Sequence, residues 1–255
     1  MPLHEALLIL LAGLAAGTIN TIVGSGTLVT FPTLLFFGFP AVTANVSNTI
    51  GLVLGGLTGT FGYRRELQGQ GPLLRRLVPM SLAGATIGAV LLLVLPASAF
   101  DAIVPVLILL GVLLVVFGKR IQAAVAAHHR DEVVGWHLPA MMIGVMLAGI
   151  YGGYFGAAQG VILMGIMGAL STLPMQRLNG IKNVLGTVAN LVGALVFIIV
   201  APEHVDWRVA ALIGVGALLG GFLGSTVGRR LPPNALRAVI VVIGVVAILK
   251  ILVFG

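Results

Sequence analysis

The chain lacks cysteine and carries very little charge. None of its 255 residues is cysteine, and only 8% are charged, with 7 acidic residues against 14 basic ones. Without cysteine it can form no disulfide, no thiolate metal site and no thiol nucleophile. With so few charges it cannot cover the surface of a soluble domain, because 59% of its residues are hydrophobic. These shortages exclude an ordinary water-soluble fold and favour a membrane protein.

What the chain has instead is a series of long apolar runs, with a mean hydropathy of +1.16. Runs of about 18 or more apolar residues are typical of membrane helices. Loop residues bound each of the complete runs, so we predict an all-α polytopic membrane protein. The predicted complete spans are residues 43–62, 77–95, 100–118, 179–200, 208–228 and 234–254.

Two further apolar regions, residues 4–37 and 137–172, are each too long for one straight membrane helix. Small and polar residues interrupt the first region within residues 20–27 and the second within residues 152–160. We therefore predict that each region is a hairpin of two helices joined by a glycine-rich break.

The basic residues favour one membrane topology. If both interrupted regions enter and leave on the same side, 12 basic residues lie in the cytoplasm and 2 lie outside. If each region crosses once, the split is 9 to 5, so the positive-inside rule favours the first topology. Three complete spans then follow each hairpin, which inverts the second half relative to the first. The predicted units are a first repeat (1–118), a cytoplasmic linker (119–136) and a second repeat (137–255).

An internal repeat agrees with this division. Residues 12–17, AGLAAG, resemble residues 148–153, AGIYGG. Residues 45–48, NVSN, resemble residues 179–183, NGIKN, with one inserted residue. Inverted repeats with paired broken helices point to the binding site of a secondary transporter.

The two breaks are the candidate site. Non-helical backbone inside a bilayer must be satisfied by protein or water, so we expect both breaks to face one cavity. The helix that follows each break directs free N–H groups at that cavity, which favours an anion. We predict that these residues bind the substrate: Asn20, Gly24, Ser25, Gly26, Thr27, Asn48, Gln159, Gly160, Lys182 and Asn183.

Other interpretations of the same residues remain open. Glycines also allow close helix packing in membranes without any ligand. Asn48 and Asn183 can bridge helices, and Lys182 can either attract an anion or extend its ammonium to the lipid headgroups. No Asp or Glu lies within a predicted span, which argues against a carboxylate cation site or an intramembrane proton relay.

One family resemblance follows from these motifs. Residues 12–35, AGLAAGTINTIVGSGTLVTFPTLL, followed by Asn45, Ser47 and Asn48, resemble the TauE/SafE family of sulfite exporters and toluene-sulfonate uptake permeases. The resemblance implies a bacterial inner-membrane transporter of sulfite, sulfoacetate or other organosulfonates, with its site between two inverted repeats. Two departures are visible: the family often has Asp at the position of Asn20, and the second motif here reads GAAQGVILMGIM, which is poorer in glycine.

The expected function is therefore export of a small sulfur-containing anion, without enzyme activity, cofactor, metal or nucleic-acid partner. A passive anion channel and a transporter of short carboxylates are the alternatives. An intramembrane hydrolase using Ser25 would need a neighbouring base, but the histidines lie at termini, in loops or at a span border. Besides the anion and the lipid bilayer, proton coupling and a homodimer are left open.

Overall fold

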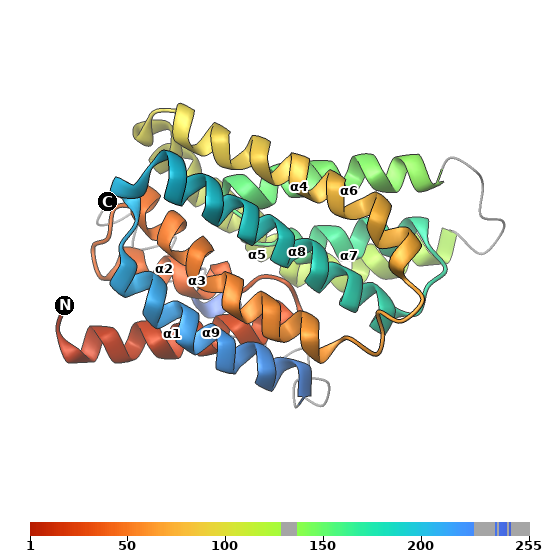
Figure 1. Ribbon diagram of the computed structural model, residues 1–255, viewed down its shortest axis with the longest axis horizontal. Helices are drawn as coiled ribbons and strands as arrows, with labels where there is room; N and C mark the ends of the chain where they lie inside the picture. The colour runs from red at the N-terminus through yellow and green to blue at the C-terminus, as the bar shows by residue number, and fades with distance from the viewer. Residues whose placement is uncertain (129–136, 227–237, 239, 244, 246–255) are drawn as a thin grey trace.

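The computed structural model describes residues 1–128, 137–226, 238, 240–243 and 245. This part of the chain is helical and contains no β-strand (Figure 1). The first half forms α1 (Leu3–Ile22), α2 (Thr27–Phe36), α3 (Ala41–Gly62), α4 (Gly71–Val94) and α5 (Ala97–His128). The second half forms α6 (His137–Tyr154), α7 (Gln159–Leu170), α8 (Met175–Val200), the 3-10 turn η1 (Pro202–His204) and α9 (Trp207–Thr226).

Five of the described helices are long and apolar enough to cross a bilayer, namely α1, α4, α5, α8 and α9. Helix α3 is equally long, but Asn45, Ser47 and Asn48 lower its hydropathy. Large apolar side chains such as Leu7, Val94 and Ile199 are exposed on the outer surface, as expected for groups that face lipid. The chain is therefore a multi-pass membrane protein.

The first interrupted region folds back on itself. A Cβ atom on Gly26 would lie 3.0 Å from the Cβ of Asn20, so α2 starts beside the end of α1. At the other end of the hairpin, Phe36 and Leu8 line the same surface groove. Helices α1 and α2 are therefore antiparallel, joined by the break at residues 23–26.

The second interrupted region has the same form. The side chain of Gln159, the first residue of α7, lies against Gly152 near the end of α6. Ile166, about two turns further along α7, lies against Gly144 of α6. Both breaks lie within the segments where the sequence predicts them, here at residues 155–158.

Five predicted spans overlap the described helices α3, α4, α5, α8 and α9, and apart from the end of α5 their bounds differ by six residues or fewer. Helix α5 runs on to His128, ten residues past its predicted end, because residues 119–128 are mostly good helix formers such as Ala, Gln and Lys. The rest of the linker and most of the predicted span 234–254 lie outside the described residues.

Helices of the first half pack lengthwise against helices of the second half. Helix α1 of the first half lies along α9 of the second, and α6 of the second half lies along α4 of the first (Figure 1). Glycines permit both contacts: a Cβ on Gly17 would lie 2.3 Å from the carbonyl oxygen of Ala217, and one on Gly153 would lie 2.1 Å from that of Ala85. Such close backbone approach is a main way in which membrane helices associate. The reciprocal packing is the kind that two related repeats would produce, and their inverted orientation stays a prediction.

Two described segments that carry basic residues, the α3–α4 loop and the start of α8, lie at the same end of the bundle. The phenol of Tyr63, at the end of α3, accepts a 2.7 Å hydrogen bond from the amide of Asn179, near the start of α8. Leu67, in the loop after α3, packs on Gly180. The α3–α4 loop and the start of α8 therefore share an end, as they do in the topology that the basic residues favour.

Candidate functional site

The two helix breaks touch in the interior of the protein. The main-chain N–H of Gly160, at the start of α7, donates a 3.0 Å hydrogen bond to the carbonyl oxygen of Gly24. A Cβ on Gly24 would lie 2.4 Å from the Cα of Gly160, so neither residue has room for a side chain. Gly24 also has a φ of 88°, in the region that favours glycine. Glycine at both positions therefore allows the halves to meet backbone to backbone.

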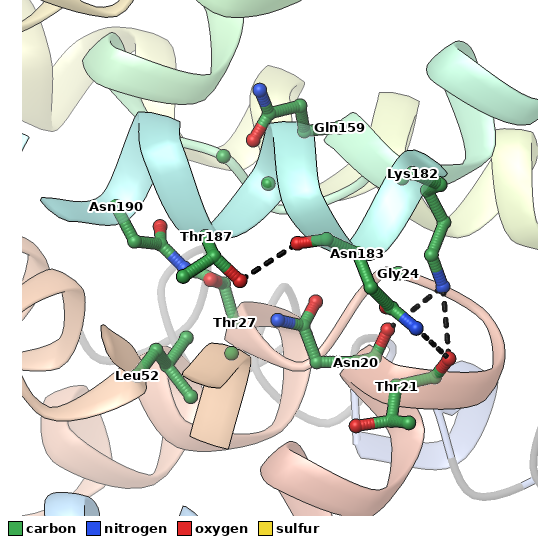
Figure 2. A pocket seen from close by; sticks show the side chains of 14 residues that line it. Asn20, Thr21, Gly24, Thr27, Leu52, Gln159, Lys182, Asn183, Thr187 and Asn190 are labelled. Carbon is green, nitrogen blue, oxygen red and sulfur yellow. Dashed lines mark hydrogen bonds between the residues drawn. The ribbon is translucent and has the colours of Figure 1, made fainter. Parts of the chain in front are cut away.

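A small polar cavity lies beside this contact. It offers about 20 Å³ to the centres of water molecules, which is room for one or two of them. No acidic side chain of the described residues lines it. The lining residues come from both halves: Asn20, Thr21, Gly24, Thr27, Leu52, Gly56, Gly156, Gln159, Gly160, Lys182, Asn183, Gly186, Thr187 and Asn190 (Figure 2).

Lys182 supplies the positive charge of this cavity. Its side chain is 2% exposed, so its ammonium does not reach the lipid headgroups. Instead, Nζ donates hydrogen bonds of 3.0 Å to the carbonyl oxygens of Asn20 and Thr21, in the last turn of α1 (Figure 2). These carbonyls have no partner within the helix and carry the negative end of its dipole. A lysine of the second half thus caps the C-terminal carbonyls of α1, the broken helix of the first half.

Two asparagines of α8 strengthen the same contact. The carbonyl oxygen of Thr21 also accepts hydrogen bonds from the side-chain amides of Asn179, at 3.4 Å, and Asn183, at 3.3 Å. A related bond occurs at the other break, where the amide of Asn45 donates a 3.0 Å bond to the carbonyl of Tyr154, the last residue of α6. In each half, an asparagine amide therefore caps a C-terminal carbonyl of the broken helix in the other half.

Most of the residues predicted from the sequence line the cavity. Seven of the ten do so: Asn20, Gly24, Thr27, Gln159, Gly160, Lys182 and Asn183. Whether they bind a substrate stays a prediction. The other three, Ser25, Gly26 and Asn48, lie behind the lining.

Asn48 is buried and holds the start of α2 in place. Its side-chain amide donates a 3.2 Å bond to the hydroxyl of Thr27, and its oxygen accepts a bond from the hydroxyl of Thr30. Both ends of the side chain are thus occupied within the protein. Of the two roles considered for Asn48, the structure favours bridging of helices over direct contact with a ligand.

Ser25 and Gly26 are also packed inside the protein. A Cβ on Gly26 would lie 2.4 Å from the carbonyl oxygen of Ala16, so this glycine lets α2 approach α1. Ser25 is fully buried, and its hydroxyl has no hydrogen-bond partner among the described residues. A serine nucleophile needs a base within hydrogen-bonding distance, and the described surroundings of Ser25 provide none.

Main-chain donors without a backbone partner lie at the starts of the helices that follow the two breaks. Within the described residues, the main-chain amides of Ser25, Gly26, Thr27 and Ala157 make no hydrogen bond to a backbone carbonyl. Of these four residues, Thr27 lines the cavity. These amides lie at the starts of α2 and α7, where the helix dipoles favour negative charge.

Two side chains that line the cavity also have amides free to bind a ligand. The amides of Asn20 and Asn190 have no hydrogen-bond partner among the described residues, and both line the cavity. Gln159 differs, because its side chain points away from Asn20 and Asn183 and lies against Gly152 of α6 (Figure 2). We therefore expect Asn20 and Asn190, rather than the side chain of Gln159, to contact a ligand.

The polar face of α8 was not among the residues predicted from the sequence. Gly186, Thr187 and Asn190 line the cavity together with Asn183. Their spacing of three and four residues places them on one face of a helix. Because this periodicity is visible in the sequence, it was available as a signal for the site.

Comparison with known proteins identifies the family. Residues 9–251 match the family model described as sulfite exporter TauE/SafE. The chain belongs to the TauE/SafE family. Among its relatives, the probable membrane transporter protein ORF9 of Sinorhizobium sp is 26% identical over 254 residues, which cover 98% of this chain and 93% of the relative. No solved structure matches the chain.

Other relatives of this TauE/SafE chain carry the same kind of name. The probable membrane transporter protein YfcA of Escherichia coli K12 is 25% identical over 238 residues, 93% of this chain and 86% of the relative. A probable membrane transporter protein of Haemophilus influenzae is 23% identical over 233 residues, 90% of this chain and 88% of the relative. Together with the apolar helices, these matches identify this TauE/SafE protein as a membrane transporter.

Proposed function

We propose that this protein is a secondary transporter that exports a small sulfur-containing anion, such as sulfite, sulfoacetate or another organosulfonate. The anion would bind in the cavity where the two helix breaks meet. The observation that carries this proposal is the contact between Gly24 and Gly160 beside a polar cavity that contains a buried Lys182 and no described acidic side chain. Discontinuous helices that meet near the middle of the bilayer are a common form of substrate site in secondary transporters.

The electrostatics of the cavity support an anion. The ammonium of Lys182 uses two of its three N–H donors on α1, which leaves one for a ligand. The start of α2 adds the main-chain N–H of Thr27, and Asn20 and Asn190 add side-chain amides. An oxyanion with several acceptor oxygens matches this set of donors, whereas a cation would find few free acceptors.

The size of the cavity favours a carrier over a passive channel. A volume that holds one or two water molecules is too small for a hydrated anion to pass through. We therefore expect the halves to move apart when the anion enters, which is the behaviour expected of alternating access. Movement of the broken helices against the rest of the bundle would open the cavity to one side at a time.

We place the transporter in a bacterial inner membrane, without enzyme activity. Helical bundles are the usual architecture of that membrane, since proteins of the bacterial outer membrane are mostly β-barrels. The three relatives described above come from bacteria. The buried hydroxyl of Ser25, without a described base beside it, gives no support to hydrolysis.

Flux into liposomes tests the proposal. Purified protein is reconstituted, and transport of labelled sulfite, sulfoacetate and a short carboxylate is followed, with protein-free liposomes as the control. We expect saturable flux of a sulfur-containing anion, in which unlabelled sulfite competes. Flux that does not saturate would identify a passive channel instead. Faster flux of the carboxylate than of the sulfur-containing anions would mean that the substrate is a carboxylate. Absence of flux for every anion would contradict the proposal.

A further inference from the structure

The contact between Lys182 and α1 has the geometry of a cation site. Two main-chain carbonyl oxygens, those of Asn20 and Thr21, converge on Nζ at 3.0 Å each. They belong to the C-terminal turn of a helix that ends inside the protein, and no described carboxylate pairs with the ammonium. The partners of this buried charge are therefore main-chain dipoles rather than an acidic side chain.

In secondary transporters with broken helices, such carbonyls commonly bind the coupling cation. Half-helix C-termini and unwound carbonyl oxygens coordinate Na⁺ or H⁺ there, because they provide concentrated negative potential without a formal charge. In this protein a further oxygen lies nearby. Asn179, three residues before Lys182 on α8, has a buried side-chain oxygen with no partner among the described residues. The oxygens suit a small cation, but an ammonium from the chain itself already occupies the position.

The other half of the repeat lacks this ammonium. In the sequence repeat, Ser47 takes the place of Lys182, between Asn45 and Asn48. The hydroxyl of Ser47 accepts a 2.9 Å hydrogen bond from the main-chain N–H of Asp206 and so serves a different contact. The lysine is thus a feature of one half only, added where the carbonyls of α1 face the cavity.

We infer that Lys182 is a resident substitute for a coupling cation. Its ammonium fills the cation position at the end of α1, so that the protein binds and moves its anion without any bound Na⁺. This inference rests on the proposed anion transport and specifies its ion dependence. The ammonium holds the broken helix of the first half against α8 and directs its remaining N–H into the cavity. A bound Na⁺ would otherwise supply the positive charge at this position.

The first test measures the ion dependence of the unaltered protein. Anion flux into liposomes is compared with Na⁺ on both sides and with choline replacing all Na⁺ at the same ionic strength. We expect equal rates in the two conditions. A fall of about tenfold or more when Na⁺ is removed, equivalent to about 1.4 kcal/mol, would overturn the inference and leave the proposed anion transport intact.

The second test asks whether removal of the ammonium exposes the cation site. The melting temperature of purified Lys182→Ala is measured in detergent against increasing NaCl, butylammonium chloride and choline chloride. Lys182→Met is the matched control, because its side chain fills the same space without charge. We expect Na⁺ or butylammonium to stabilise Lys182→Ala saturably, choline to have no such effect, and neither the control nor the wild type to respond.

Failure of this second test is separable from failure of the proposed function. If neither Na⁺ nor butylammonium raises the melting temperature of Lys182→Ala, the inference is overturned, whatever the flux assay shows. If Lys182→Ala does not fold, the choline experiment on the wild type still decides. If no anion is transported at all, the proposed function fails, and the melting measurements still test the cation site.

Discussion

The carbonyl oxygen of Gly24 accepts a hydrogen bond of 3.0 Å from the main-chain N–H of Gly160, although the two residues are 136 positions apart in the chain. This bond joins the helix break of one half to that of the other, without any side chain between them. Opening of the cavity must therefore either separate these two glycines or move both breaks together. The predictions below depend on this central contact and on the polar groups around it.

Replacement of Gly160 by alanine should destabilise the protein. The new Cβ would lie 2.4 Å from the Cα of Gly24, and backbone on both sides of the contact would have to move. Overpacking of this kind costs about 1–3 kcal/mol, so the melting temperature in detergent should fall. Gly165→Ala is the control on the same helix, because nothing lies within 4 Å of its Cβ position. Equal melting temperatures for the two variants would show that the breaks do not touch.

Asn48→Ala should act on stability rather than directly on a ligand. It removes two buried hydrogen bonds and leaves the hydroxyl of Thr27 without a described partner, while the hydroxyl of Thr30 keeps a 3.5 Å bond to the carbonyl of Gly26. A buried polar group left unpaired costs about 1–3 kcal/mol. In a double-mutant cycle with Thr30→Val, the two losses should be clearly less than additive. Additive losses would mean that the two side chains do not interact.

Asn190→Asp should weaken anion binding strongly. Its amide lines the cavity, has no described partner and is only partly exposed. A carboxylate about 5 Å from a bound anion, at an effective dielectric constant of about 20, would repel it by about 3 kcal/mol. We therefore expect the KM of anion flux to rise more than tenfold, whereas the uncharged Asn190→Leu should raise it less. Unchanged kinetics in Asn190→Asp would place the anion elsewhere.

The topology can be tested by labelling single cysteines, since the natural chain contains none. Gln68 and Arg177 are exposed near the end of the bundle where the α3–α4 loop meets α8, and Glu203 is exposed in η1 beyond the other end of α8. Cysteines at positions 68 and 177 should react with an impermeant maleimide from the cytoplasmic face only, and a cysteine at 203 from the outer face only. Labelling of positions 68 and 177 from opposite faces would refute the proposed hairpins.

The sequence predicted those parts of the structure that local composition determines. Both breaks were visible because glycine and polar residues interrupt long apolar runs, and a backbone that leaves the helix needs such residues. Lys182 was also predicted as a site residue, with extension of its ammonium to the lipid headgroups as the alternative. Its partners were not, because the carbonyls of Asn20 and Thr21 are about 160 positions away in the chain, and any carbonyl looks the same in a sequence.

The role of Asn48 shows a second limit of sequence reasoning. Its place in the repeat, matching Asn183, suggested a matching role in the site. In the structure the two asparagines differ: Asn183 lines the cavity, whereas Asn48 is turned toward Thr27 and Thr30 of the preceding helix. The rotation of a helix about its axis depends on the packing of all its neighbours. A repeat in sequence therefore predicts equivalent positions but not equivalent contacts.

The most direct test of the account is to locate a bound anion. Selenite has the shape and charge of sulfite, and the selenium atom gives an anomalous signal in X-ray diffraction. Crystals of the protein grown with selenite should show one strong anomalous peak between the two breaks, within hydrogen-bonding reach of Lys182 and Asn190. A well-occupied selenite bound only outside this cavity, with the contact of Gly24 and Gly160 unchanged, would contradict the account.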